Sequence, residues 1–290
     1  MSNSSGIVNI NGVIAPIADG RVSVLDHGFL FGDNIYETLR TYNSQPFLFS
    51  RHFARLQRSA NAIFLTLPWD RTKTKAEVLR TIAAAGVGEH RIRVTITRGV
   101  GDVTPDPDSC DSPNAIIFAT PFTAPSDKLY TEGVDVVVSS FYRSKQLGDA
   151  KTGNLLRSVL AMREAKAAGA FEAITLTADG KISDGITSNL WLVQGNRLLT
   201  PSIDSGILEG ITRAVVLELA RREGLEVFEG LLDLSEVAKS SELFLTSSTR
   251  EIVPIVRVAG KPVGTGRPGP ITMRLLAAYR REVDVLLKED

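Results

Sequence analysis

The sequence predicts an α+β fold with antiparallel-rich sheets, because strand-like and helix-like segments mix along it without steady alternation. The clearest strand-like segment is residues 91–99, in which apolar and polar residues alternate strictly. The clearest helix-like segment is residues 51–63, in which apolar residues recur every three or four positions. A doubly wound parallel sheet would need strands and helices in regular succession, so that class is disfavoured.

The first part of the chain, residues 1–120, is expected to form a small domain. It opens with a hairpin over residues 7–14, because Asn11-Gly12 favours a tight turn. A strand follows at residues 35–42, where Tyr36 and Arg40 share a face that could line a polar pocket or lie in solvent. The other elements expected here are helices at 51–63 and 73–85, strands at 91–99 and 115–120, and a surface loop at 100–113.

Residues 121–133 are expected to link this domain to a larger one, because the stretch Pro121 to Asp127 has the composition of a linker. The larger domain is expected to span residues 134–290. Two of its strands, 172–177 and 188–193, are expected to pair about the turn 178–180. Its other expected elements are strands at 134–140, 242–246 and 253–258, and helices after Lys151, at 210–222 and from about 269.

The composition excludes several classes of function. The 290 residues include 33 Lys and Arg and 33 Asp and Glu, so no basic excess favours nucleic acid or an anionic membrane. The single cysteine, Cys110, excludes an internal disulfide, and three scattered histidines disfavour a zinc site. The N-terminus lacks the apolar core of a signal peptide, and no apolar run is long enough to span a bilayer. We therefore expect a cytoplasmic globular protein.

Lys151 is a candidate nucleophile. It lies between a polar loop, residues 144–149, and a helical pattern that begins near Leu155 and predicts a buried face. A lysine held at a helix start loses solvation and feels the positive end of the helix dipole, and both effects favour the neutral amine. A neutral amine attacks carbonyls, as Schiff-base chemistry with pyridoxal 5′-phosphate (PLP) requires. Taken alone, however, the stretch more often indicates a surface lysine beside a helix cap.

Two stretches could bind a phosphate. At Gly210-Ile211-Thr212 a glycine precedes a helix, so backbone N–H groups and the Thr212 hydroxyl could point at an anion. At Ser247-Ser248-Thr249 three hydroxyls follow a buried strand. Each stretch alone is more often an ordinary helix cap or polar turn. No glycine-rich nucleotide-binding fingerprint is present in the sequence.

Five separated motifs together resemble the fold-type IV PLP enzymes, which include branched-chain aminotransferases, D-amino-acid aminotransferases and 4-amino-4-deoxychorismate lyases. The resemblance extends from Asn9 to about Tyr279, and the motifs stand in the family's order. They are Leu25-Asp26-His27-Gly28 to Gly32-Asp33-Asn34-Ile35-Tyr36-Glu37, His52-Phe53-Ala54-Arg55-Leu56, Lys151-Thr152-Gly153-Asn154, Leu208-Glu209-Gly210-Ile211-Thr212-Arg213 and Phe244-Leu245-Thr246-Ser247-Ser248-Thr249-Arg250-Glu251-Ile252. The resemblance implies a two-domain fold of the D-amino-acid aminotransferase type.

The resemblance also implies roles for single residues. Lys151 matches the lysine that binds PLP as a Schiff base and then moves the Cα proton, and Arg55 matches the arginine that grips the phosphate. Thr212 and the N–H of Ile211 match one side of the phosphate site. Ser247 and Ser248 match the other side, and Leu208 matches a leucine that packs on the pyridine ring.

One residue departs from the family pattern. The family places a glutamate against the pyridine nitrogen, and here the corresponding acid is Asp184, which is one methylene shorter. A carboxylate there keeps the nitrogen protonated, so that the ring can withdraw electrons. Asp184 can do so if the backbone moves in or a water bridges the gap; otherwise it is only a turn residue beside Gly185.

The substrate residues suggest a branched-chain type. D-amino-acid enzymes of the family place an arginine and a histidine in the loop that here is residues 99–104, and this chain has neither. Arg93 matches the arginine of the branched-chain enzymes, and Arg40 and Arg91 could help it bind a second carboxylate, or Arg91 and Arg93 could lie in solvent. The other candidate substrate residues are Tyr36, Phe141 and Thr249.

We therefore expect a PLP-dependent transaminase that moves an amino group between an amino acid and a 2-oxo acid, with a branched-chain L-amino acid or L-glutamate favoured. The alternatives are an aminodeoxychorismate lyase, a D-amino-acid aminotransferase, and a PLP-binding protein whose catalysis is impaired by Asp184. The resemblance implies a homodimer, to which the segment 26–36 and the loop 100–113 would contribute.

Overall fold

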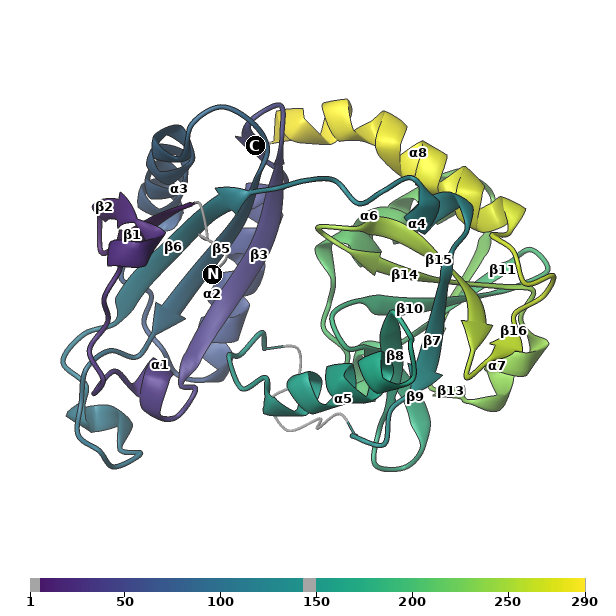
Figure 1. The fold of residues 1–290 in the computed structure, drawn as a ribbon, viewed down its shortest axis with the longest axis horizontal. Helices are drawn as coiled ribbons and strands as arrows, with labels where there is room; N and C mark the ends of the chain where they lie inside the picture. The colour runs from purple at the N-terminus through teal and green to yellow at the C-terminus, as the bar shows by residue number, and fades with distance from the viewer. Residues whose placement is uncertain (1–5, 143–149, 290) are drawn as a thin grey trace. The chain divides into compact units, whose positions relative to one another are not determined.

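The computed structural model describes residues 6–142 and 150–289, which fold into two compact units (Figure 1). Unit 1 comprises residues 1–123, 150–154 and 284–290, and unit 2 comprises residues 124–149 and 155–283. The chain thus passes between the units at several points. The segments 150–154 and 284–290, which the sequence-based division places in the C-terminal domain, group with unit 1.

Unit 1 is built on a six-stranded antiparallel sheet in the order β2-β1-β6-β5-β3-β4. Its helices α2 (Phe49–Ala62) and α3 (Arg71–Ala85) share one buried cluster with strands β3, β5 and β6. They therefore cover the same face of the sheet (Figure 1). The strands are β1 (Ile7–Ile10), β2 (Val13–Pro16), β3 (Asn34–Tyr42), β4 (Gln45–Pro46), β5 (His90–Thr97) and β6 (Asn114–Pro121).

The hairpin predicted at residues 7–14 is confirmed, and both turn residues adopt positive φ angles, 52° at Asn11 and 91° at Gly12. Such a turn matches the right-handed twist of its strands. The predicted strands and helices of this unit are likewise confirmed, to within a few residues at their ends. The loop 100–113 contains one short 3-10 helix, Pro107–Ser109.

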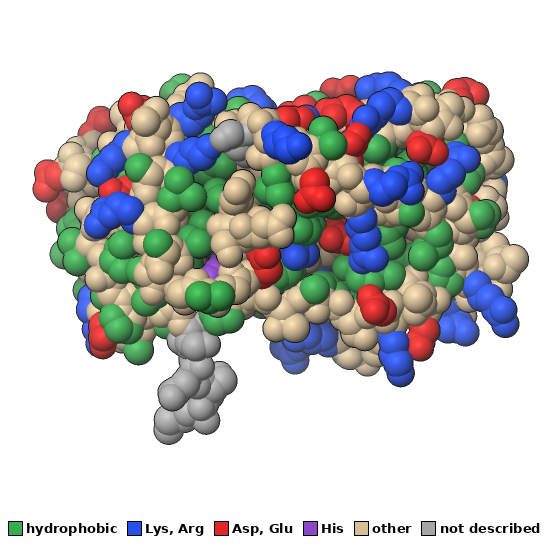
Figure 2. Space-filling model, turned by 90° about the horizontal axis from the view of Figure 1, so that it is seen from above, with side chains coloured by type: hydrophobic (Ala, Val, Ile, Leu, Met, Phe, Trp, Pro, Cys, Tyr) green, Lys and Arg blue, Asp and Glu red, His purple; other side chains and the backbone are tan. Residues whose placement is uncertain are grey.

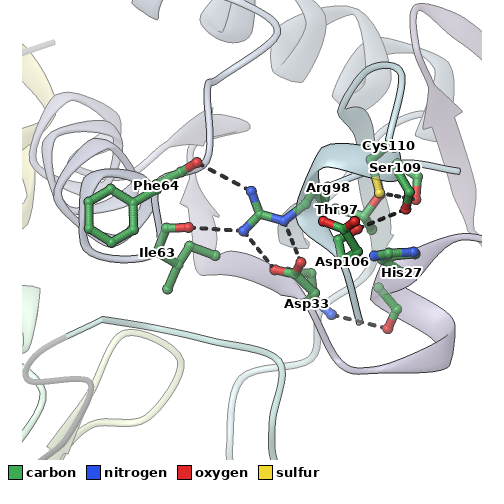
Figure 3. A network of polar contacts seen from close by, with 12 residues as sticks. His27, Asp33, Ile63, Phe64, Thr97, Arg98, Asp106, Ser109 and Cys110 are labelled. Atoms are coloured by element: carbon green, nitrogen blue, oxygen red, sulfur yellow. Dashed lines mark hydrogen bonds and ion pairs between the residues drawn. The ribbon is translucent and has the colours of Figure 1, made fainter. Parts of the chain in front are cut away.

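Buried polar contacts fix the loop that precedes β3, which includes the short helix α1 (His27–Leu30). The Asp26 carboxylate accepts hydrogen bonds from Gly28 N, Thr97 Oγ1 and Asn114 Nδ2 at 2.7, 2.8 and 2.7 Å. Arg98 pairs with Asp33 and donates to the carbonyl oxygens of Ile63 and Phe64 at 2.9 and 3.2 Å (Figure 3). The entry to β3 is therefore held from several elements of unit 1.

Unit 2 is built on a ten-stranded mixed sheet in the order β12-β11-β10-β14-β15-β7-β8-β9-β13, with β16 paired to β15. The pairs β11–β12, β15–β7 and β7–β8 are parallel and the others antiparallel. The strands are β7 (Val134–Val138), β8 (Glu172–Leu176), β9 (Lys181–Gly185), β10 (Asn189–Gln194), β11 (Arg197–Pro201), β12 (Glu226–Gly230), β13 (Leu232–Asp233), β14 (Glu242–Ser247), β15 (Glu251–Val258) and β16 (Lys261–Pro262). The helices are α4 (Lys128–Thr131), α5 (Leu156–Ala167), α6 (Ile211–Arg222), α7 (Ser235–Lys239) and α8 (Pro270–Leu286). The antiparallel-rich α+β class is thus confirmed.

Two expectations about unit 2 are wrong. The strand at 172–176 pairs with β9, which the sequence did not reveal, whereas residues 189–194 pair with β11 and β14. The hairpin forms between β8 and β9 because turn residues 177–180 directly join them. In addition, the large apolar residues of α5 were expected to form its buried face. The residues that α5 buries are instead Ala161 and Ala165, and Leu156 and Val159 are exposed to solvent.

The surface carries both signs of charge. On the face shown in Figure 2, basic and acidic side chains lie intermixed, in keeping with their equal numbers in the sequence. Across residues 6–142 and 150–289, no helix has the length and apolarity to cross a membrane.

Candidate active site

Unit 1 contains a buried ionic network between β3 and α2. Arg55 donates from Nε and Nη2 to the two oxygens of Glu37, both at 2.7 Å, and His52 Nδ1 lies 2.6 Å from Glu37 Oε2. All three side chains are at most 3% exposed. His52 and Arg55 are three positions apart, so both lie on the face of α2 that packs against β3. A bidentate carboxylate fixes the orientation of the Arg55 guanidinium as well as its charge.

The charges in this network shift one another's ionisation. Burial alone would raise the pKa of Glu37, but the adjacent Arg55 guanidinium and His52 outweigh it and hold that pKa well below its usual range. Burial lowers the pKa of His52, and the positive charges of Arg55 and Lys151 lower it further, against the opposing effect of Glu37. Glu37 is therefore ionised and His52 neutral at neutral pH.

Lys151 is positioned by its backbone along the edge of β3. Its carbonyl accepts from Tyr36 N at 2.9 Å, and its own N–H donates to Ser59 Oγ at 3.0 Å. Gly153 N donates to Asn34 O at 2.9 Å, and a Cβ at Gly153 would lie only 2.1 Å from Asn34 Oδ1. A larger residue would have to displace the Asn34 side chain, so glycine at position 153 favours this close approach of the segment to the strand.

The surroundings of Lys151 differ from those predicted from sequence. Lys151 precedes the first residue of α5, Leu156, by five positions and bonds to β3 of unit 1. A helix dipole acts mainly within the first turn, so the predicted effect of the helix start does not apply. Instead, the Lys151 ammonium lies 4.6 Å from the centre of the Tyr36 ring.

Tyr36 lies within reach of two cations. The Arg93 guanidinium lies 3.7 Å from its ring centre, besides the Lys151 ammonium. Burial raises the pKa of the Tyr36 hydroxyl, and Arg93 offsets part of that rise. Burial lowers the pKa of Arg93, and Tyr36 opposes that shift. An arginine remains charged under such a shift, so Arg93 offers a positive charge against the Tyr36 ring.

Arg40 lies farther along the same strand. Its guanidinium stacks 3.9 Å from the centre of the Tyr42 ring and 4.3 Å from that of Phe122, and its Nε donates to Thr41 O at 3.2 Å. The side chain is 7% exposed. The structure thus brings Tyr36, Arg55, Arg93 and Lys151 together and places Arg40 in an aromatic setting of its own.

Unit 2 holds the acid that departs from the family pattern. Asp184, on β9, is 1% exposed and accepts from Asn189 Nδ2 at 3.1 and 3.0 Å and from Leu208 N at 3.2 Å. The same Asn189 amide donates to Leu208 O at 2.7 Å. Asn189 therefore ties the acid to the segment that leads into α6. A buried carboxylate in such a setting suits a positively charged partner.

The start of α6 forms a cradle beside this acid. Gly210 is the N-cap and provides no side-chain cap for the helix, so the first N–H groups of α6 are left to other acceptors. A Cβ on Gly210 would lie 1.9 Å from Asn189 Oδ1, so a larger residue there would have to displace the Asn189 side chain. Ile211 and Thr212 are 8% and 3% exposed. A helix start with these features can bind an anion.

The polar turn at residues 247–249 begins at Ser247, the last residue of β14, close to Asn189 in the sheet. Asn189 is the register partner of Thr246, so the turn begins one residue beyond that pair. Ser247, Ser248 and Thr249 are half-buried. Phe141, the last candidate, is half-buried and packs against a cluster that includes Ala161 and Ala173.

The groups found in each unit, considered separately, suit the chemistry of a phosphorylated pyridine cofactor such as PLP. Unit 1 supplies a lysine amine and a fixed arginine, and unit 2 supplies a buried acid, a glycine cradle at a helix start and a hydroxyl-bearing turn. In such a cofactor an amine can take the carbonyl carbon, a buried carboxylate can face the ring nitrogen, and an arginine or a helix start can bind the phosphate.

Several residues that shape these groups have no predicted role in the sequence. Glu37 and His52 were noted only within motifs, and Ser59 and Asn189 were given no role. The spacing of His52, Arg55 and Ser59 places three polar residues on one face of α2, which is a signal that could have identified a polar contact there.

Comparison with known proteins decides the family. Residues 34–258 match the model of the family described as amino-transferase class IV. This chain belongs to the class IV aminotransferases. It is an enzyme of a PLP-dependent family, as the five motifs predict.

The relatives of this class IV aminotransferase have several activities. A Methanocaldococcus jannaschii protein provisionally named a branched-chain-amino-acid aminotransferase is 34% identical, over 94% of this chain and 95% of its own. The D-alanine aminotransferase of Bacillus licheniformis is 30% identical, over 95% of this chain and 96% of its own. The aminodeoxychorismate lyase of Bacillus subtilis is also 30% identical, over 98% and 97%.

Solved structures support the fold. The Escherichia coli branched-chain amino acid aminotransferase matches with a TM-score of 0.91 and 30% identity, over 96% of this chain and 95% of that one. The branched-chain aminotransferase of Thermoproteus uzoniensis, solved with norvaline, matches with a TM-score of 0.87 and 30% identity, over 98% and 95%. The 4-amino-4-deoxychorismate lyase of Pseudomonas aeruginosa matches with a TM-score of 0.85 and 28% identity, over 96% and 99%. The fold-type IV prediction is therefore confirmed.

Replacing Glu37 with glutamine should destabilise unit 1 strongly. Glu37→Gln leaves the Arg55 charge buried without its partner, and we expect the free energy of unfolding to fall by about 3–5 kcal/mol. Urea denaturation followed by circular dichroism measures the change. Glu289→Gln, which removes the exposed pair with Arg51, is the matched control and should change stability by less than about 1 kcal/mol. Equal effects of the two substitutions would contradict the role of Glu37.

The lowered pKa of His52 predicts a pH dependence. In the unfolded chain a histidine takes up a proton near pH 6.5, whereas folded His52 resists protonation until the pH is lower. The unfolded state thus binds more protons over that interval, and stability should fall as the pH drops from about 7 toward 5. His52→Gln should show a shallower fall over the same interval when unfolding is measured at each pH. Identical slopes for the two proteins would show that His52 does not titrate in this way.

Proposed function

We propose that this enzyme is a PLP-dependent transaminase that moves an amino group between an amino acid and a 2-oxo acid, with Lys151 as its catalytic residue. The observation that carries the proposal is the placement of Lys151, whose backbone is bonded to β3 and Ser59 and whose amine lies beside Tyr36. A lysine held this way by its backbone leaves its side chain to act on a cofactor.

The chain's own residues would divide the work. Bound PLP supplies a carbonyl that accepts the amino group and a ring that withdraws electrons from the substrate carbon. Lys151 Nζ would hold the cofactor and, once an amino acid displaces it, would carry the proton from the substrate Cα to the former aldehyde carbon of PLP. Asp184, steadied by Asn189, would keep the ring nitrogen protonated.

Binding of the phosphate would fall to two groups of residues. Arg55, oriented by Glu37, would neutralise its charge. The N–H of Ile211, the hydroxyl of Thr212 and the hydroxyls of Ser247 and Ser248 would donate hydrogen bonds to its oxygens. Leu208, whose backbone bonds to Asp184 and Asn189, would pack on the ring.

We propose a branched-chain L-amino acid or L-glutamate as the amino donor. Arg93 offers a charge beside Tyr36 for a carboxylate, and Thr249 offers a backbone N–H in the polar turn. Phe141 would contribute an apolar wall, and Arg40 a more distant charge. The names of the Methanocaldococcus jannaschii relative and of the Escherichia coli structure support this choice.

Other activities remain alternatives because relatives of similar identity carry them. The Bacillus subtilis lyase and the Bacillus licheniformis D-alanine aminotransferase are each 30% identical to this chain. A PLP-binding protein with impaired catalysis is a further alternative, motivated by the shorter acid at Asp184. Release of pyruvate from aminodeoxychorismate without any 2-oxo acid would identify the lyase.

We also propose a cytoplasmic homodimer. Several apolar side chains of unit 1 are exposed on the loops before β3 and after β5, which is unusual unless a partner covers them. They include Val24, Phe29 and Val103, at 70%, 68% and 71% exposure. A second copy of this chain would be the occupant of that surface.

The donor can be identified from the visible absorption of the purified enzyme loaded with PLP. The lysine-bound cofactor absorbs in the visible, and we expect L-leucine, L-valine or L-glutamate to bleach that band and a 2-oxo acid to restore it. Lys151→Ala should not form the band at all. Bleaching by D-alanine or D-glutamate alone would contradict the proposed stereochemistry, and no bleaching by any amino acid would contradict transamination.

The role of Asp184 predicts a contrast between two substitutions. Asp184→Asn removes the carboxylate and should lower kcat about 100-fold or more, because the charge facing the ring nitrogen is lost. Asp184→Glu restores the length usual in the family and should retain activity within about tenfold. Steady-state kinetics with the donor found above measures both, and equal activity of Asp184→Asn and wild type would contradict the role.

A further inference from the structure

A second ionic network lies in unit 2, next to the polar turn at residues 247–249. Its centre is Glu172, on β8, which is fully buried, and Arg250, the residue that follows the turn. Arg250 Nη1 lies 3.3 Å from Glu172 Oε2, and the Arg250 guanidinium lies 5.2 Å from the centre of the Phe171 ring. The proposed chemistry uses neither residue of this pair.

The network is bonded to the segment that carries the acid. Glu172 Oε1 accepts from Thr187 N at 2.5 Å and from Thr187 Oγ1 at 3.1 Å, and Arg250 Nη2 donates to the same hydroxyl at 2.6 Å. Thr187 lies between Asp184 and Asn189, the two residues that form the acid site. Thr187 is therefore held by both members of the ion pair.

Arg250 also donates hydrogen bonds to the polar turn. Its Nε donates to Ser247 Oγ at 3.1 Å, and its backbone N–H donates to Ser247 O at 3.2 Å. The next residue, Glu251, has a φ of 56°, a backbone angle that is unusual for residues other than glycine. Arg280 holds Glu251 through a bond of 2.7 Å, so this strained turn is fixed from outside as well.

This arrangement is better suited to fixing positions than to stabilising the fold. Glu172 is fully buried and Arg250 is 20% exposed. The attraction within such a pair repays little of the cost of removing the Glu172 charge from water, so its presence is weak evidence for a stabilising role. The guanidinium is planar and rigid, and here one group contacts the Ser247 hydroxyl, the Thr187 hydroxyl and the Glu172 carboxylate. Its geometry thereby sets the spacing between two loops.

We propose that Arg250, held by Glu172, is a positioning residue that sets the distance between the turn 247–249 and the segment 184–189. This inference rests on the proposed function, in which the turn binds the phosphate of PLP and Asp184 faces its ring nitrogen. If the spacing is fixed, one PLP molecule can place its phosphate at the turn and its ring nitrogen at Asp184 at the same time. Neither contact is then made at the expense of the other.

The test compares the affinities of the apoenzyme for PLP and for pyridoxal, which lacks the phosphate, in wild type and Arg250→Gln. We expect Arg250→Gln to bind PLP about tenfold or more weakly while its affinity for pyridoxal changes little, because the turn no longer meets the phosphate. Arg250→Lys keeps the charge without the planar fork and should recover only part of the loss. Arg257→Gln is the control, since Arg257 lies on β15, the strand that follows Arg250, in an exposed pair with Asp135.

Absorption titrations at a temperature well below the melting of each apoenzyme keep affinity separate from stability. A lower melting temperature with unchanged affinity for PLP would overturn the proposal, as would equal losses for PLP and pyridoxal. If Arg250→Gln does not fold, Thr187→Val removes only the shared hydroxyl and should weaken PLP binding several-fold; unchanged binding would overturn the proposal. A wild-type enzyme that binds no PLP would instead contradict the proposed function itself.

Discussion

The pairing of residues 150–154 with strand β3 is the constraint on which the candidate site of unit 1 depends. Lys151 is distant in sequence from β3, yet its carbonyl and the N–H of Gly153 bond to that strand and its own N–H bonds to Ser59 of α2. The segment thus behaves as an added edge of the sheet. The pairing fixes the Cα atom of Lys151, so that only the lysine side chain needs to move during a reaction.

Strand β3 also explains why the neighbouring charges are where they are. Alternate residues of a strand point to opposite faces, so Tyr36 lies beside Lys151 while Glu37 enters the space under α2. There Glu37 binds Arg55 and His52, and the same helix supplies Ser59 to Lys151. One strand and one helix therefore orient the lysine, the arginine and the aromatic ring together. In unit 2, Asn189 has a comparable role, because it joins Asp184, Leu208 and the glycine cradle.

The sequence predicts most of the elements because their periodicity is local. The hairpin about Asn11-Gly12 and the apolar face of α2 need no distant partner to be recognised. Strand pairing is harder to predict from the sequence. The short strand β9 pairs with β8, and β10 pairs with β11 and β14, both of which come later in the chain. The exposure of Leu156 and Val159 was not foreseen for a similar reason, because periodicity shows that a helix has an apolar face but not what that face packs against.

The candidate residues were found by motif, and their partners were not. Nothing in the sequence shows that Glu37 meets Arg55, that Asn189 meets Asp184, or that Arg250 meets Glu172, because each pair is separated by five to 78 positions and is joined only by the fold. The setting of Lys151 was misjudged because a helix start was assumed where the chain runs along a strand.

The central claim is that Lys151 carries the cofactor, and its most direct test is chemical. The enzyme loaded with PLP would be reduced with borohydride, digested and sequenced by mass spectrometry. The account predicts a phosphopyridoxyl group on Lys151 Nζ, and none on that peptide when the loaded enzyme is not reduced. A modification on another lysine, or none on any lysine of an enzyme that has bound PLP, would contradict it.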